Sequence, residues 1–419
     1  MRRRLLAAAT ALAATLIGVF MLAKPAAAAT LQEITGFGTN PSNLRMHVYV
    51  PNTVQARPPI LVAVHYCTGS GPAFYSGTEF ASLADRYGFV VVYPSATRSG
   101  SCFDVSSPQA LKRGGGSDPV GIMSMVTYAE QHYNGDPGRV YVTGASSGGM
   151  MTNVLLGDYP DVFKAGAAFM GVPFGCFATT DGSSWNSQCS GGQRIYTPQV
   201  WGDMVRAAYP GYTGARPRMQ LFHGTTDTTL AYLNFGEEIK QWTNVLGVSQ
   251  TPVSTDTPQA NWTRTRYGNA SAQAPVEAIS IAGVGHSLPL SGQAAMAITF
   301  FGLDTTGPTQ SATPSRSASS SPPPNNGGGC TATTSVNQWQ GGFVVTVRVT
   351  AGSAAINGWT VGLALPSGAT VTNSWNVTRS GNNWSSVSYN GHVNAGQYTE
   401  WGVQGTGTAG TLSPTCSAS

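Results

Sequence analysis

The chain has 419 residues, of which 41% are hydrophobic and only 10% are charged, with 22 Lys and Arg against 18 Asp and Glu. Four of these cations, Arg2, Arg3, Arg4 and Lys24, lie in the first 29 residues, which hold no acidic residue, so the rest of the chain carries 18 charges of each sign. A formally neutral chain without a basic cluster argues against nucleic acid as a partner.

Residues 1–29 have the layout of a secretory signal peptide. The three arginines are followed by the apolar stretch LLAAATALAATLIGVFMLA and by Ala27-Ala28-Ala29, which suits a cleavage site better than an uncleaved anchor. No other segment is long and apolar enough to span a bilayer, so we predict a secreted, extracellular protein without a membrane partner.

Residues 30–303 alternate short apolar runs with helical patterns such as 118–133. This alternation predicts an α/β fold with a mostly parallel sheet that helices cover on both faces. The ligand site of such a sheet lies at the carboxyl ends of its strands. The β-rich runs are residues 60–65, 89–93, 140–144, 165–170, 219–223 and 276–282.

A candidate nucleophile follows one of these runs. The segment 140–148 reads VYVTGASSG, in which a strand pattern leads into the G-x-S-x-G turn centred on Ser146, and MMTNVLL continues as a helical pattern. Strand, tight turn and helix form the context of a nucleophile elbow, in which the flanking glycines leave room for a sharp turn. The alternative is an ordinary Gly-rich turn.

A serine nucleophile needs a base and an acid that orients the base, and in α/β-hydrolases they follow in the order Ser, Asp or Glu, His. His286, in the loop GVGHSLP, fits the base, and Asp227, in HGTTDTT, fits the acid. His223 precedes the acid and is better suited to hydrogen bonding within its own turn. The alternative acids, Asp203 and Asp256, lie in less strand-proximal segments.

The oxyanion of such a reaction needs two backbone N–H donors. Ser147 follows the nucleophile directly, and Cys67 follows the early strand pattern 60–65. We therefore expect the oxyanion hole to consist of the Cys67 and Ser147 amides, and Cys67 is also free to serve in a structural disulfide.

Several motifs in residues 30–303 resemble the secreted acetylxylan esterases of carbohydrate esterase family 1, a group related to feruloyl esterases and polyhydroxybutyrate depolymerase-like esterases. The resemblance implies an α/β-hydrolase fold with Ser146, Asp227 and His286 as the triad, and the disulfides Cys67–Cys102 and Cys176–Cys189. The motifs are HYCTGSG (65–71), SCFDVSS (101–107), GASSGGMMTNV (144–154), GVPFGCF (171–177), WNSQC (185–189), RPRMQLFHGTTDTTL (216–230), TPQANW (257–262) and GVGHSLP (283–289).

Residues 304–329 are rich in Pro, Ser, Thr and Gly, a composition that is typical of an extended linker. Residues 330–419 then show alternating strand patterns at 343–349, 359–365 and 397–403, which predict an all-β sandwich or barrel. Cys330 and Cys416 lie near the two ends of this segment, and we expect them to pair. The six cysteines by themselves leave fifteen pairings open, and their spacing predicts no metal site.

The C-terminal segment resembles a family 2 carbohydrate-binding module of the cellulose-binding kind, through NQWQGGF (337–343), INGWTV (356–361), TNSWNVT (372–378) and VSYNG (387–391). The resemblance implies a flat strip of exposed aromatic rings, which by position are Trp339, Trp375 and Tyr389. Three further tryptophans lie within strand patterns and are expected in the core: Trp359, Trp384 and Trp401.

Together these patterns predict a secreted, monomeric serine esterase that removes acetyl groups from xylan without a metal or an organic cofactor. Its module would bind crystalline cellulose or xylan. The alternatives are a feruloyl esterase, a short-chain polyester depolymerase and a non-catalytic carbohydrate-binding protein on a hydrolase scaffold. Trp185 and Trp201 lie either near the site or in the packing of a lid.

Overall fold

The computed structural model describes residues 29–304, 329–339, 341–387, 390–410 and 412–418. They divide into two compact units, one within Met1–Thr313 and the other within Pro314–Ser419. The predicted signal peptide 1–29 and linker 304–329 lie almost wholly outside the described residues. The two units are described separately below.

The first unit contains a ten-stranded mixed sheet in the order β1-β2-β4-β3-β5-β6-β7-β10-β9-β8. The six strands from β4 to β10 in this order run parallel, and antiparallel strands extend the sheet at both edges. The strands are β1 (Gln32–Ile34), β2 (Arg45–Tyr49), β3 (Ile60–Val64), β4 (Val90–Ser95), β5 (Val140–Ala145), β6 (Phe163–Phe169), β7 (Arg218–Gly224), β8 (Ser254–Asp256), β9 (Trp262–Tyr267) and β10 (Val276–Ile281).

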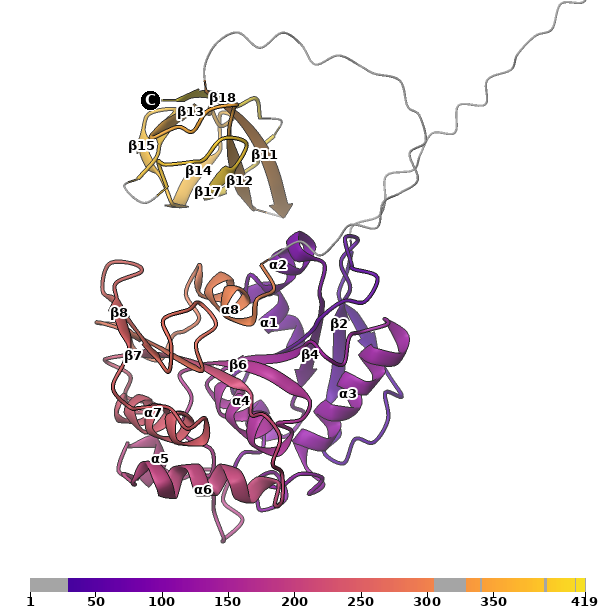
Figure 1. Cartoon of the computed structure of the whole chain (residues 1–419). Coiled ribbons are helices and arrows are strands. Elements are labelled where there is room, and N and C mark those ends of the chain that lie inside the picture. The colour runs from indigo at the N-terminus through magenta and orange to yellow at the C-terminus, as the bar shows by residue number, and fades with distance from the viewer. Residues whose placement is uncertain (1–28, 305–328, 340, 388–389, 411, 419) are drawn as a thin grey trace, which may run out of the picture. The chain divides into compact units, whose positions relative to one another are not determined.

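Helices cover both faces of this sheet, as predicted (Figure 1). One face carries α1 (Gly71–Gly77), α2 (Phe80–Tyr87) and α8 (Gln293–Phe301). The other carries α3 (Asp118–His132), α4 (Ser147–Asp158), α6 (Pro198–Ala208) and α7 (Leu233–Val245), and the short α5 (Ser187–Ser190) precedes α6.

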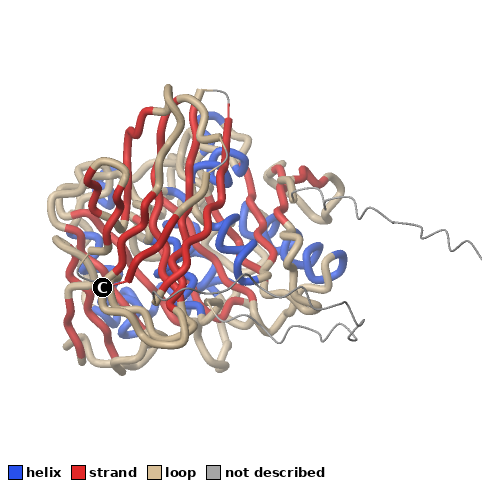
Figure 2. Tube along the Cα trace, turned by 90° about the horizontal axis from the view of Figure 1, so that it is seen from above, coloured by secondary structure: helices blue, strands red, loops and turns tan. Residues whose placement is uncertain are grey.

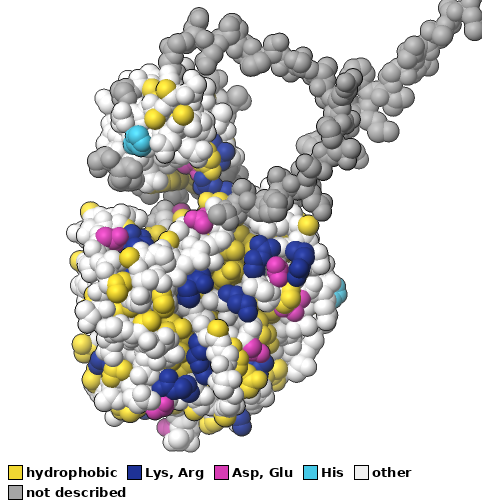
Figure 3. All heavy atoms as spheres, in the orientation of Figure 1, with side chains coloured by type: hydrophobic (Ala, Val, Ile, Leu, Met, Phe, Trp, Pro, Cys, Tyr) yellow, Lys and Arg dark blue, Asp and Glu magenta, His cyan; other side chains and the backbone are white. Residues whose placement is uncertain are grey.

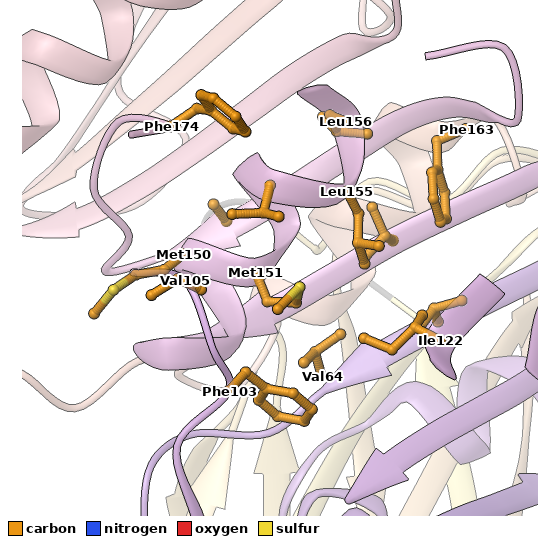
Figure 4. Packing of buried hydrophobic residues seen from close by; sticks show 14 of the residues in the cluster. Val64, Phe103, Val105, Ile122, Met150, Met151, Leu155, Leu156, Phe163 and Phe174 are labelled. Carbon is orange, nitrogen blue, oxygen red and sulfur yellow. The ribbon is translucent and has the colours of Figure 1, made fainter. Parts of the chain in front are cut away.

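The alternation of side chains along the strands builds two apolar layers, one on each face of the sheet. In β3, Val62 and Val64 join the layer under α3 and α4, whereas Leu61 and Ala63 join the layer under α1, α2 and α8. Figure 4 shows side chains of α4 packed with Val64 and with other residues of the first layer. This packing holds the N-terminus of α4 firmly at the carboxyl end of β5.

The second unit consists of two four-stranded antiparallel sheets, β11-β12-β17-β14 and β15-β16-β13-β18, which is a sandwich. Among the described residues all α-helices belong to the first unit, with α8 ending at Phe301. Figure 2 distinguishes helices, strands and loops along the chain by colour. The strands are β11 (Cys330–Trp339), β12 (Gly342–Ala351), β13 (Trp359–Gly362), β14 (Thr370–Trp375), β15 (Thr378–Ser380), β16 (Asn383–Ser385), β17 (Tyr398–Thr406) and β18 (Thr415–Ala418). Trp359, Trp384 and Trp401 are buried between the sheets, which confirms their predicted core position.

Candidate active site

Ser146 lies in the turn between β5 and α4, at the carboxyl end of the parallel strands. Its φ of 55° and ψ of −117° fall in a region that non-glycine residues rarely adopt. Such strain persists only where the surroundings impose it, and it is typical of functional positions. Here the Ser146 N–H donates to the Phe169 carbonyl at 2.9 Å, and the Ser146 carbonyl accepts from Met150 in the first turn of α4.

The glycines of the turn are required by the close approach of neighbouring backbone. A Cβ on Gly148 would collide with the carbonyl of Val64, the last residue of β3. A Cβ on Gly144 would collide with the same carbonyl and with Gly148 itself. The G-x-S-x-G pattern therefore lets β5, α4 and β3 meet tightly around Ser146.

Three side chains from different loops meet at this turn. Ser146 Oγ lies 2.9 Å from His286 Nε2, and His286 Nδ1 lies 2.7 Å from Asp227 Oδ2. His286 follows β10 and Asp227 follows β7, which are neighbouring strands of the sheet. A neutral His286 that donates from Nδ1 to the carboxylate presents the lone pair of Nε2 to the serine hydroxyl.

Asp227 is buried and held by several donors. Its Oδ1 accepts from the backbone N–H of Thr229 at 2.9 Å and of Leu230 at 3.0 Å. Burial by itself raises the pKa of this carboxyl, but hydrogen bonds from His223, His286 and Leu230 outweigh burial and hold the pKa well below its ordinary range. Asp227 is therefore an anion throughout the ordinary pH range.

The other carboxylates considered from the sequence do not reach this site. Asp203 is exposed and pairs with Arg206 of the same helix at 2.8 Å. Asp256 is likewise accessible to solvent and pairs with Arg264 at 2.6 Å. Both are ordinary surface ion pairs.

Ser146 and His286 line a pocket with a volume of about 560 Å³. Its inner walls are mostly apolar, whereas two pocket residues are exposed aromatics: Tyr66 is 41% and Trp185 is 45% accessible. Trp201 is fully buried and donates to Glu237 at 2.7 Å, so of the two tryptophans only Trp185 belongs to the site. The remaining apolar lining consists of Ala73, Phe74, Met150, Met170, Leu230, Leu288 and Pro289.

The loop after β3 brings Cys67 into the same pocket. A disulfide joins Cys67 to Cys102, and the N–H of Thr68, with a φ of 64°, donates to the Gly100 carbonyl at 2.7 Å. On the other side of Ser146, Ser147 is the first residue of α4, where a backbone N–H has no partner within the helix. Cys67 therefore lines the same pocket as Ser146, and Ser147 directly follows Ser146, while their role as oxyanion donors stays a prediction.

His65, to which the sequence analysis gave no role, anchors the loop after β3 through buried hydrogen bonds. It is fully buried, its Nδ1 lies 2.6 Å from the Tyr66 carbonyl, and its Nε2 accepts from the Ala96 N–H at 3.1 Å. Burial lowers the pKa of His65 to about 4, although the hydrogen bond to Tyr66 acts in the opposite direction. A polar residue at the end of a fully apolar strand was the only signal available in the sequence.

The other cysteines pair as the sequence analysis expected. The structure joins Cys176 to Cys189 and Cys330 to Cys416, and the described residues contain no free cysteine. The first pair closes the loop 176–189, which contains Trp185, and the second joins β11 to β18. Three disulfides are typical of proteins that fold in an oxidising compartment.

In the second unit, one aromatic residue of the predicted strip is described. Trp375 is partly accessible and pairs across the strands with Gly402, where a Cβ would collide with the indole ring. Because the neighbours of Gly402 in β17 point into the core, Gly402 and the ring above it lie on the outer face of the sheet. The side chain of Trp339 and the whole of Tyr389 lie outside the described residues.

On the face of the first unit shown in Figure 3, basic and acidic side chains are interspersed. No large patch of basic side chains alone, of the kind that binds polyanions, is visible on that face. Within the described ranges, no group of three or more His, Cys, Asp or Glu side chains could hold a metal ion. No helix in the same ranges has the length and apolar character needed to cross a membrane.

Comparison with known proteins gives matches for both units. Residues 44–249 match the family model described as esterase PHB depolymerase, and residues 330–418 match that of the cellulose binding domain. The chain is 47% identical over 277 residues to the probable acetylxylan esterase A of Aspergillus fumigatus. These residues cover 65% of this chain and 73% of the relative.

Two further matches bear on the site. Feruloyl esterase B of Talaromyces stipitatus is 46% identical over 265 residues, which cover 63% of this chain and 73% of the relative. The solved structure of the acetyl xylan esterase from Aspergillus awamori is 43% identical, with a TM-score of 0.62, and the match covers 65% of this chain and 99% of that one. The first unit therefore has the same fold as that enzyme.

Proposed function

Because this chain belongs to the family of the acetylxylan esterases and ends in a cellulose binding domain, we propose that it is a secreted serine esterase that removes acetyl groups from xylan. The observation that carries the proposal is the unbroken chain of hydrogen bonds from Ser146 through His286 to Asp227 at the edge of the pocket. Ser146 is the nucleophile, His286 the general base and Asp227 the orienting acid.

In the acylation step, the Ser146 hydroxyl transfers its proton to His286 Nε2 while Oγ attacks the acetyl carbonyl carbon. The Cys67 and Ser147 amides donate to the oxyanion that forms. The tetrahedral intermediate then collapses, and the sugar oxygen leaves with the proton from His286. Asp227, already an anion, stabilises the imidazolium between these transfers.

In the deacylation step, a water molecule takes the place of the sugar. His286 removes a proton from this water, whose oxygen attacks the acetyl-enzyme, and the same proton returns to Ser146 Oγ when acetate leaves. The side chains that these steps require are all present around the pocket, so no metal or organic cofactor enters the scheme.

The pocket suits a small ester on a carbohydrate. Its apolar interior can hold the acetyl methyl group, and the exposed rings of Tyr66 and Trp185 at the same pocket can pack against sugar faces.

We propose that the second unit, residues 330–419, binds cellulose or xylan through Trp375 together with Trp339 and Tyr389. Residues 1–29 act as the signal peptide and residues 304–329 as the linker between the two units.

The deciding experiment measures acetate released from acetylated xylan and ferulate released from methyl ferulate, with wild type and Ser146→Ala. We expect acetate from wild type only, and a loss of several orders of magnitude in kcat for the variant. Near wild-type activity of a folded Ser146→Ala would remove the nucleophile assignment.

A second candidate substrate is a feruloyl ester. The pocket volume of about 560 Å³ is much larger than an acetyl group needs, and feruloyl esterase B is among the relatives. If ferulate release exceeds acetate release in the same experiment, the triad assignment stands and the substrate is the aromatic ester.

A further inference from the structure

His223 is a second histidine beside the carboxylate of Asp227. It lies near the end of β7 and is fully buried. Its Nε2 is 2.9 Å from the Leu230 carbonyl and 3.3 Å from Asp227 Oδ2. Because a carbonyl oxygen can only accept, Nε2 must carry a hydrogen. That N–H also faces the carboxylate oxygen that accepts from His286.

The rest of the His223 ring makes no other polar contact among the described residues. Its Nδ1 is buried without a hydrogen-bond partner. The ring packs edge-on against Tyr232 and Phe235, with centroids 6.0 and 6.2 Å away, and the Tyr232 hydroxyl pairs instead with Ser280. Asp227 is thus the charged side chain in contact with His223. A buried unpartnered nitrogen is unfavourable, which an apolar residue at this position would avoid.

We propose that His223 is a positioning residue for the hydrolytic reaction and that it acts through Asp227. The His286 N–H donates to Oδ2, the Nε2–H of His223 lies 3.3 Å from the same oxygen, and the amides of Thr229 and Leu230 hold Oδ1. The carboxylate can then neither rotate away from His286 nor concentrate its charge on one partner. This inference rests on the proposed serine esterase mechanism.

A purely structural role makes different predictions. If His223 only tied the turn 224–230 together through the Leu230 carbonyl, its loss would lower stability without altering the pH dependence of catalysis. If it acts through Asp227, the remaining carboxylate is less neutralised and holds a proton on the adjacent imidazole more strongly. The acid limb of the kcat/KM profile then moves to higher pH.

The test uses the full chain and p-nitrophenyl acetate, a soluble ester whose hydrolysis does not depend on which polysaccharide the enzyme prefers. His223→Leu removes the donor at similar size, and we expect kcat to fall by about 10- to 100-fold with little change in KM and with the acid limb shifted upward. His223→Gln can place an amide N–H near the position of Nε2 and should recover most of the activity, whereas the shorter His223→Asn should not. If His223→Leu does not fold, the comparison of Gln with Asn decides the question.

A double-mutant cycle separates the two roles. In an Asp227→Asn background, His223→Leu should have little further effect on kcat, since the carboxylate through which it acts is gone. Equal effects in both backgrounds, or an unchanged pH profile in a folded His223→Leu or His223→Asn, would overturn the proposal. A wild type that hydrolyses p-nitrophenyl acetate but not acetylated xylan would refute the proposed substrate and leave this inference intact.

Discussion

Acidification should destabilise the first unit through His65. The buried ring accepts from the Ala96 N–H at Nε2 and contacts the Tyr66 carbonyl at Nδ1, and only the neutral tautomer with hydrogen on Nδ1 satisfies both. Burial lowers the pKa of His65 from 6.5 to about 4, against the effect of the hydrogen bond to Tyr66. Between these two pH values the unfolded chain binds a proton at His65 that the folded chain does not bind.

The sign and the size of the effect follow from linkage. Where the unfolded state binds more protons, the free energy of unfolding rises with pH, so the contribution of His65 is full above pH 6.5 and is lost as the pH falls to about 4. A pKa difference of about 2.5 units corresponds to about 3 kcal/mol. For a domain of this size, 3 kcal/mol corresponds to roughly 6 °C in Tm.

The assay compares wild type with His65→Gln by calorimetry of the full chain between pH 7 and pH 4, following the transition in which esterase activity is lost. Gln fills a similar volume but does not titrate. Other titrating groups contribute equally to both proteins, so the difference in Tm isolates His65. We expect wild type to be more stable at pH 7 and its advantage to shrink by roughly 6 °C at pH 4.

His132→Gln provides the matched control, since His132 is an exposed histidine on α3. It measures what the same substitution does at the surface. If the advantage of wild type over His65→Gln does not change with pH, or if it grows toward pH 4, the assignment of a neutral, buried His65 is wrong.

Three further predictions concern other parts of the molecule. Tyr66→Ala should raise KM for acetylated xylo-oligosaccharides by about 2- to 12-fold while Tyr66→Phe does not, and an equal rise with p-nitrophenyl acetate would contradict a sugar-packing role. Burial raises the pKa of Glu238 to about 8, although the hydrogen bond from Asn153 acts in the opposite direction, so the contribution of Glu238 to stability falls as the pH rises from about 4.5 to 8. In thermal scans, the Tm of Glu238→Gln should therefore rise relative to that of wild type across this range. A Tm difference that does not change with pH would refute a neutral Glu238. Trp375→Ala should reduce retention on cellulose in a pull-down and leave hydrolysis of soluble esters unchanged, and full retention would exclude Trp375 from the binding face.

The edges of the main sheet illustrate what apolar patterns miss. The six central strands have long apolar runs because helices cover them on both faces. Near one edge, β9 reads WTRTRY instead, and its arginines Arg264 and Arg266 pair with Asp256 of the edge strand β8 and with Glu277 of β10. Charged residues are typical of the edge of a sheet, where they discourage pairing with other chains, so a search for apolar runs does not find β8 and β9.

Some polar residues around the candidate site could be predicted from the sequence, and others could not. Ser146 was predictable because a nucleophile elbow is a local feature of nine consecutive residues. His65 and the contact of His223 with Asp227 were not predictable, because their partners depend on how the loops after β3, β4 and β7 fold back. Motif order could select His286 and Asp227 as candidates but could not give their distances.

The sequence by itself determined the features that depend on near neighbours along the chain: the alternation of strands and helices, the G-x-S-x-G turn, the order of the candidate triad residues, and the compositions that predict a signal peptide and a linker. Only the tertiary structure decided which side chains meet. Ser146 and His286 are 140 residues apart, and they come within 2.9 Å because the parallel sheet brings the carboxyl ends of β5, β7 and β10 to one edge. Burial, the donors on Asp227 and the pocket walls arise from that packing, which no local pattern encodes.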